Sequence, residues 1–145
     1  MKRLHIHIRT DDLEGSISYY TALFGAEPVR REDDYAKWML DDPAANVALS
    51  SRGGEPGLDH VGVSLDENSA LEDMALRMRE AEAPLVQEEN TTCCYAKSNK
   101  YWSHDPQGTV WELFHSFGDS EVYGQTAPEV VSAKTAATGC CAPNV

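Results

Sequence analysis

The sequence has no long apolar run and few basic residues, and both absences exclude classes of protein. Its 145 residues include 12 Lys and Arg against 24 Asp and Glu, a formal net charge of -12. Such a charge repels phosphate backbones and anionic lipids, so we expect neither nucleic acid nor a membrane as partner. No stretch approaches the about 20 apolar residues of a membrane-spanning helix. The basic start reaches Asp11 and Asp12 before an apolar run of signal-peptide length forms, so no secretory leader is expected.

Cysteine is scarce, and its distribution argues against a disulfide framework. All four cysteines fall in two adjacent pairs, Cys93-Cys94 and Cys140-Cys141. Neighbouring Cα atoms lie about 3.8 Å apart, closer than the about 4.4 to 6.8 Å that a disulfide prefers, so adjacent cysteines resist pairing with each other. The pattern is a poor framework for a secreted domain and favours a reducing cytoplasm.

The composition is that of one globular domain, with 41% hydrophobic and 25% charged residues. We expect this single domain to cover 1–124, because the sequence after Gly124 is small and polar without sustained periodicity. Residues 125–145 are predicted to form a flexible C-terminal tail. The tail carries Cys140-Cys141, either without a fixed role or as a second dithiol.

The predicted secondary structure repeats once along the chain. The first unit has a strand, a helix and three strands: 4–9, 13–24, 27–32, 35–40 and 47–51. The second unit follows the same order: 58–63, 68–83, 85–88, 100–104 and 109–115. Two βαβββ modules, about 1–53 and 54–124, therefore predict an α+β fold whose curved mixed sheet surrounds a shared site.

Local signals predict how the helices end and how the first strand is oriented. Asp11 or Asp12 offers an N-cap to the first helix, and Gly25 ends it. Ser69 and Glu72 form a capping box for the second helix. In the first strand, apolar positions 4, 6 and 8 alternate with polar positions 5, 7 and 9, and we expect the apolar face to be the core.

Three side chains suggest a metal site. His5 and His60 begin the two repeat units, and Glu112 lies in the last strand. Two imidazoles and a carboxylate form the ligand set of non-haem Fe(II) oxygenases. His7 shares the face of His5 and is the rival first ligand. The alternative for Glu112 is an exposed strand position that faces water.

The pair Cys93-Cys94 lies in 90–99, where the second unit has a longer connection than the first. Two adjacent thiols could bridge one soft ion. Successive side chains of a strand point to opposite faces, so bridging requires this stretch to leave strand geometry. The alternative is a pair of half-buried cysteines in a strand.

Several stretches carry a resemblance to a known superfamily. They read LHIHIRTDDL over 4–13, LFG over 23–25, LDHVGV over 58–63 and DPQGTVWE over 105–112. Together they resemble the vicinal oxygen chelate superfamily of glyoxalases, extradiol dioxygenases and resistance proteins. The resemblance covers roughly 1–118 and specifies no single reaction.

A narrower resemblance concerns the sequence ENTTCCYA over 89–96, which is similar to the signature of the carbon-arsenic lyases and of related cadmium-inducible proteins. It implies that Cys93 and Cys94 bind a trivalent organoarsenical. It also implies that Fe(II) on His5, His60 and Glu112, the last also catalytic, activates dioxygen as co-substrate to split the carbon-arsenic bond.

These features predict a cytoplasmic arsenic-resistance enzyme. The expected reaction is that of an Fe(II)-dependent dioxygenase, a carbon-arsenic lyase that removes methyl or aromatic groups and releases arsenite. We expect a monomer or homodimer with a small-molecule substrate. The rivals are a non-catalytic protein that sequesters cadmium or arsenite, and another dioxygenase, lyase or isomerase of the same fold.

Overall fold

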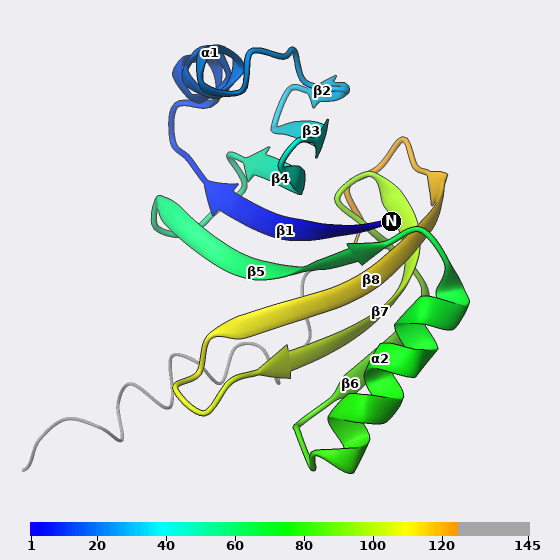
Figure 1. Cartoon of the computed structure of the whole chain (residues 1–145). Helices are drawn as coiled ribbons and strands as arrows, with labels where there is room; N and C mark the ends of the chain where they lie inside the picture. The colour runs from blue at the N-terminus through cyan, green and yellow to red at the C-terminus, as the bar shows by residue number, and fades with distance from the viewer. Residues whose placement is uncertain (125–145) are drawn as a thin grey trace, which may run out of the picture. The chain divides into compact units, whose positions relative to one another are not determined.

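The structure, a computed structural model, describes residues 1–124, and contacts along the chain divide it into two units. The first unit is Met1–Ser64, and the second begins at Leu65 (Figure 1). The predicted single domain over 1–124, with modules of about 1–53 and 54–124, stays a prediction. The predicted tail and its cysteine pair lie outside the described residues.

The first unit is a mixed sheet with one helix. Its elements are β1 Lys2–Arg9, α1 Leu13–Phe24, β2 Arg30–Glu32, β3 Tyr35–Asp41, β4 Ala44–Ser50 and β5 Gly57–Leu65. The strands are ordered β2-β3-β4-β1-β5. β1 runs parallel to β4, whereas β3 is antiparallel to both β2 and β4. β1 is an interior strand of this sheet because it lies between β4 and β5.

The helix α1 has the ends that its sequence predicts. The Asp12 carboxylate accepts a hydrogen bond of 3.0 Å from the backbone N–H of Gly15, and Gly25 ends the helix in the left-handed conformation with φ 64°. Leu13 and Ile17 of α1 pack in a cluster with Trp38 of the sheet. Burial of these apolar side chains holds the helix against its sheet.

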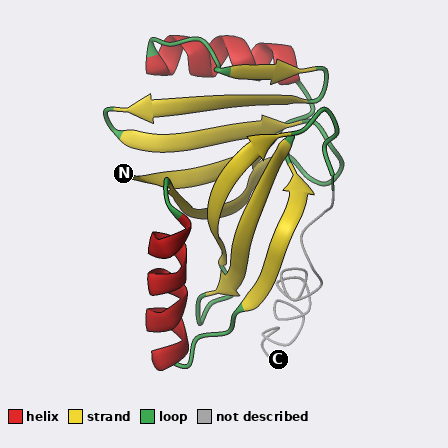
Figure 2. Cartoon of the chain, turned by 90° about the vertical axis from the view of Figure 1, so that its right-hand side faces the viewer, coloured by secondary structure: helices red, strands yellow, loops and turns green. Residues whose placement is uncertain are grey.

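The second unit holds one helix against an antiparallel set of strands. Its elements are α2 Asn68–Glu80, β6 Val86–Cys93, β7 Ala96–His104 and β8 Val110–Asp119, with the strands ordered β8-β7-β6. Figure 2 shows each helix lying against strands of its own unit. Among the described residues, no helix has both the length and the hydropathy needed to cross a membrane.

The predicted capping box of α2 is wrong. The N-cap is Glu67, and it makes no side-chain capping hydrogen bond. Glu72 accepts a hydrogen bond of 2.9 Å from the Tyr101 hydroxyl instead, so a contact with the sheet has replaced the local one. The helix also ends at Glu80 rather than at 83, because Glu82 adopts a positive φ of 54°.

The predicted long connection over 90–99 is also wrong, because β6 and β7 extend through it as a hairpin. β6 continues to Cys93, and β7 begins at Ala96. The register shifts between Glu88 and Thr91, where Asn90 has a φ of 50°. This irregularity absorbs part of the extra length and lets pairing resume up to the turn.

Both faces of β1 are covered, although only the apolar face was expected to be buried. Ile8 of the apolar face packs against the hydrophobic core cluster, as predicted, but the polar face is buried as well. His5 and His7 are 5% and 3% exposed, whereas Leu4 is 49% exposed. Each buried imidazole has a hydrogen-bond partner on β4, Asn46 for His5 and Ser50 for His7. These partners offset the cost of burying polar rings, and alternation alone does not reveal them.

Candidate functional site

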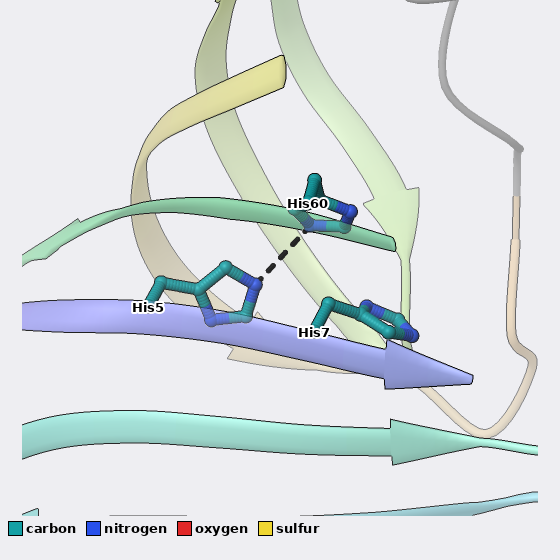
Figure 3. Close-up of side chains that lie close together, drawn as sticks. All are labelled: His5, His7 and His60. Atoms are coloured by element: carbon teal, nitrogen blue, oxygen red, sulfur yellow. Dashed lines mark hydrogen bonds between the residues drawn. The ribbon is translucent and has the colours of Figure 1, made fainter. Parts of the chain in front are cut away.

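The first unit contains a buried cluster of histidines. His5 and His7 project from the buried face of β1, and His60 projects from β5 (Figure 3). One ring nitrogen from each of the three residues lies within 4.8 Å of the others. Imidazole is a ligand of divalent transition metals, so three rings gathered in this way could hold such an ion. The structure thus brings together both rival ligands of β1 with His60.

The closest pair in this cluster has the spacing of two ligands on one ion. The Nε2 atoms of His5 and His60 are 3.3 Å apart. Bonds of about 2.0 to 2.1 Å from imidazole to metal, meeting at angles between a right angle and a tetrahedral angle, separate the two nitrogens by about 2.8 to 3.4 Å. The observed distance therefore fits a shared metal ion.

The opposite ring nitrogens are held by hydrogen-bond acceptors. Nδ1 of His60 lies 2.7 Å from the Asp59 carboxylate, and Nδ1 of His5 lies 3.1 Å from Oδ1 of Asn46. A carboxylate only accepts hydrogen bonds, so His60 donates from Nδ1. His5 likewise donates from Nδ1 to the amide oxygen of Asn46. In both rings Nε2 then carries a lone pair, and the two lone pairs face each other. Two facing lone pairs need a proton or a metal ion between them. Acceptors behind the rings are also what orients metal-binding histidines.

Asp59 is ionised where it holds His60. Burial raises the pKa of the Asp59 carboxyl, but its hydrogen bond with His60 and the neighbouring positive groups outweigh burial and hold that pKa below its usual value. The Arg9 guanidinium is one of these groups, 2.7 Å from the carboxylate. The resulting negative charge behind His60 strengthens the basicity of its Nε2 atom.

Glu112 lies in the second unit and is buried beside a lysine. It is 5% exposed, so the alternative of a carboxylate facing water is wrong. Its Oε1 atom lies 2.6 Å from Nζ of Lys100, which is itself 3% exposed. Burial lowers the pKa of Lys100, but the charge of Glu112 outweighs burial and raises that pKa above its usual value. A positive group was expected opposite Glu112, and Lys100 is such a group. The assignment of Glu112 as a metal ligand stays a prediction.

The predicted dithiol occupies the turn of the β6–β7 hairpin. Cys93 ends β6, and Cys94 and Tyr95 form the two-residue connection to Ala96, with φ 53° and 61°. Two successive positive φ values are typical of a type I′ hairpin turn. The pair thus leaves strand geometry at Cys94, as bridging requires. The alternative of two half-buried cysteines in a strand is right about their burial and about Cys93, which ends β6, but wrong about Cys94.

The sulfurs of this turn are placed to share one atom. Sγ of Cys93 and Sγ of Cys94 are 3.3 Å apart. Thiolate bonds of about 2.3 Å to a soft ion, meeting near a right angle, separate their sulfurs by about 3.3 Å. The hydrogen bond that the Cys94 thiol shares with Cys93, its burial and the negative charge of Glu112 together raise the pKa of Cys94 well above its usual value. Cys94 is therefore a protonated thiol at neutral pH.

A cavity of about 850 Å³ lies elsewhere in the second unit, between the end of α2 and the turn that joins β7 to β8. Its lining is mainly apolar and includes Met78, Pro84, Trp111 and Leu113. None of the residues predicted to bind metal or substrate lines it. The cavity is thus distinct from both the histidine cluster and the dithiol turn.

Sequence reasoning missed three residues beside these groups. Asp59 precedes His60 directly, so an adjacent carboxylate was available as a signal. Lys100 and Glu112 occupy neighbouring strands, and the register Trp102↔Glu112 places them diagonally across the pair. Tyr123, whose hydroxyl lies 3.5 Å from Sγ of Cys94, follows the last strand and had no sequence signal.

Comparisons with known proteins identify relatives over most of the chain. A profile of the Glyoxalase/Bleomycin resistance protein/Dioxygenase superfamily matches residues 2–113. A trivalent organoarsenical cleaving enzyme of Bacillus sp. (strain MD1) is 41% identical over 121 residues, 80% of this chain and 74% of that protein. The cadmium-induced protein CadI of Mycobacterium tuberculosis (strain ATCC 25618 / H37Rv) is 33% identical over 142 residues, 97% of this chain and 93% of that protein.

Solved structures share the fold at low sequence identity. The Mn(II)-bound glyoxalase from Novosphingobium aromaticivorans has a TM-score of 0.57 at 16% identity, with 88% of this chain and 44% of that chain covered. An extradiol ring-cleaving dioxygenase from B.fuscum has a TM-score of 0.58 at 14% identity, with 82% and 34% covered. The predicted α+β class, two βαβββ modules with mixed strand pairing, is confirmed.

Proposed function

Because the chain belongs to the glyoxalase/bleomycin resistance protein/dioxygenase superfamily, we propose that it is an Fe(II)-dependent dioxygenase that cleaves the carbon-arsenic bond of trivalent organoarsenicals. The observation that carries the proposal is the dithiol turn, whose two sulfurs lie 3.3 Å apart. The relative from Bacillus sp. (strain MD1) is named a trivalent organoarsenical cleaving enzyme, which supports this substrate class. Methyl and aromatic arsenicals are the proposed substrates, and arsenite is the proposed product.

The substrate is proposed to bind by exchange of its hydroxyl groups for the two thiols. An organoarsonous acid carries two As–OH bonds. Cys93 and Cys94 each form an As–S bond, each thiol proton leaves with a hydroxyl group as water, and arsenic keeps its oxidation state. This condensation accepts the protonated thiol that the high pKa of Cys94 implies. Both sulfurs on one arsenic fix the orientation of the organic group.

The histidine cluster fits the ferrous ion that the proposal needs. His5 and His60 present paired Nε2 atoms with acceptors behind the rings, and the predicted third ligand and catalytic residue is Glu112, with His7 as the rival on β1. A bound ferrous ion would supply the site at which dioxygen is activated. For a methyl substrate, the overall reaction converts one methylarsonous acid and one dioxygen to one arsenous acid and one formaldehyde. Atoms and electrons balance in this reaction without another reductant.

The test is to incubate the ferrous-loaded protein with methylarsonous acid under air and to measure arsenite and formaldehyde by chromatography. We expect both products from wild type, and a loss of at least about 100-fold for Cys93→Ser and for His60→Ala. Tyr19→Phe, which changes an exposed hydroxyl on α1, is the matched control and should keep full activity. Absence of arsenite, or equal rates for wild type and Cys93→Ser, would contradict the proposal.

A second candidate function is sequestration of cadmium or arsenite without turnover. The 33% identity to CadI and the dithiol turn favour it. His60→Ala separates the two functions, because binding by the thiols should survive this substitution while lyase activity should vanish. Either function suits a reducing cytoplasm, where the thiols stay reduced, and a monomer or homodimer.

A further inference from the structure

The backbone that follows β8 closes onto the dithiol turn. The strap, as we call Ser120 to Gly124, contacts the turn at both of its ends. The N–H of Ser120 donates a hydrogen bond of 2.8 Å to the carbonyl of Tyr95, and Gly124 pairs with Cys93 in an isolated antiparallel bridge. Gly124 has a φ of 86°, and a Cβ atom there would lie 1.9 Å from the carbonyl oxygen of Thr92. Only glycine permits this approach.

Tyr123 is the side chain that the strap presents to the sulfurs. Its hydroxyl lies 3.5 Å from Sγ of Cys94, within hydrogen-bond range for sulfur. Its ring packs edge-on against the ring of Tyr95, with the centroids 5.6 Å apart and the planes at 86°. The ring contact fixes the direction of the phenol, so the hydroxyl stays on the sulfur.

We propose that Tyr123 is a positioning residue for the dithiol, which holds the sulfur of Cys94 turned toward that of Cys93. The inference rests on the proposed function and deepens it. The type I′ turn sets the backbone of Cys94 but leaves three staggered positions for its sulfur. A contact to the hydroxyl selects the position that faces Cys93, so the two sulfurs are pre-arranged for one arsenic.

The hydroxyl suits both states of the sulfur. A phenol both accepts and donates hydrogen bonds. The thiol of Cys94 donates to Tyr123 before the substrate binds. Once the thiol proton has left as part of a water molecule, the hydroxyl of Tyr123 donates to the sulfur bonded to arsenic. The contact therefore persists through binding and favours the bound state.

The test measures binding of phenylarsonous acid to the metal-free protein by titration calorimetry. We expect Tyr123→Phe, which keeps the ring and removes the hydroxyl, to weaken binding about fivefold, the effect of losing one neutral hydrogen bond. Gly124→Ala should weaken it more, because the strap can no longer approach the turn. Tyr19→Phe is the matched control, with no expected change.

A second readout separates positioning from general damage to the fold. In Tyr123→Phe, the NMR couplings between Hα and Hβ of Cys94 should change from those of one rotamer to an average over several, while Co(II) affinity stays unchanged. Equal arsenical affinity and equal couplings in wild type and Tyr123→Phe would overturn the inference and leave the proposed function intact. Failure of wild type to bind the arsenical more tightly than Cys93→Ser would overturn both.

Discussion

At the scale of single residues, the buried ion pair of Lys100 and Glu112 allows the second unit to hold two charges in its interior. The two groups are 2.6 Å apart and nearly inaccessible to water. Their mutual attraction is strong because little water screens it. Removal of one partner leaves a buried charge without its closest counterion.

We therefore predict that Lys100→Met destabilises the metal-free protein by about 3 to 5 kcal/mol. Urea unfolding followed by tryptophan fluorescence measures this free energy. The matched control is the double variant Lys100→Met with Glu112→Gln, which removes both charges of the pair and should recover most of the loss. A single variant as stable as wild type would show that Lys100 is not the main counterion of Glu112.

The sequence reveals the residues of the site that occupy matching positions in the two repeat units. His5 and His60 are recognisable because each begins a repeat unit, and the structure brings their rings together. Lys100 and Tyr123 are not recognisable in this way, because their roles depend on partners 12 and 29 residues away. Such pairings require the strand register and the path of the chain after β8.

At the scale of elements, the turn between β7 and β8 is stabilised by one carboxylate. Asp105 accepts hydrogen bonds of 2.8 Å and 2.9 Å from the backbone N–H groups of Gln107 and Thr109. The bond to Thr109 contributes most to holding the pKa of Asp105 below its usual value. A group with a lowered pKa in the folded state stabilises the fold in its ionised form.

We predict that Asp105→Ala lowers the Tm at pH 7 and that this difference disappears in acid. The contribution of Asp105 is present above its unfolded pKa of about 3.9 and is lost as the pH falls through the lower folded value. Thermal unfolding between pH 7 and about pH 2.5 follows this change. Asp33→Ala, an exposed carboxylate between β2 and β3, is the control. A Tm difference that persists unchanged in acid would contradict the assignment.

The elements themselves were predictable where local signals decide them. α1 has both its predicted ends because Asp12 and Gly25 act within one turn of the helix. The capping box of α2 failed because Tyr101, 29 residues away, binds the carboxylate of Glu72. The burial of the polar face of β1 was missed for a related reason, since Asn46 and Ser50 make that face suitable for burial. Propensity and alternation predict elements well, but distant polar partners decide whether a polar face is also buried.

At the scale of the whole molecule, metal binding and folding are coupled, because the histidine cluster draws its residues from both ends of the first unit. His5 lies on β1 and His60 on β5, 55 residues later. The unfolded chain does not hold these rings 3.3 Å apart, so a metal on the cluster binds the folded state preferentially.

We predict that Co(II), at about 100 times its Kd, raises the free energy of unfolding by about 2.7 kcal/mol. Thermal or urea unfolding with and without the metal measures the difference. His60→Ala should abolish the effect, whereas His104→Ala, outside the three-histidine cluster, should retain it. Equal stabilisation of wild type and His60→Ala would exclude the cluster as the metal site.

The conformation of the hairpin turn implies a conflict between stability and activity. Cys94 and Tyr95 both adopt left-handed backbone angles, φ 53° and 61°, which asparagine and glycine adopt at lower cost. A sequence selected for stability alone would drift toward Asn-Gly at these positions and lose the second thiol. If the proposed function is correct, exposure to a thiol-seeking substrate opposes this drift, and lineages freed from that exposure should lose the cysteine before they lose the fold.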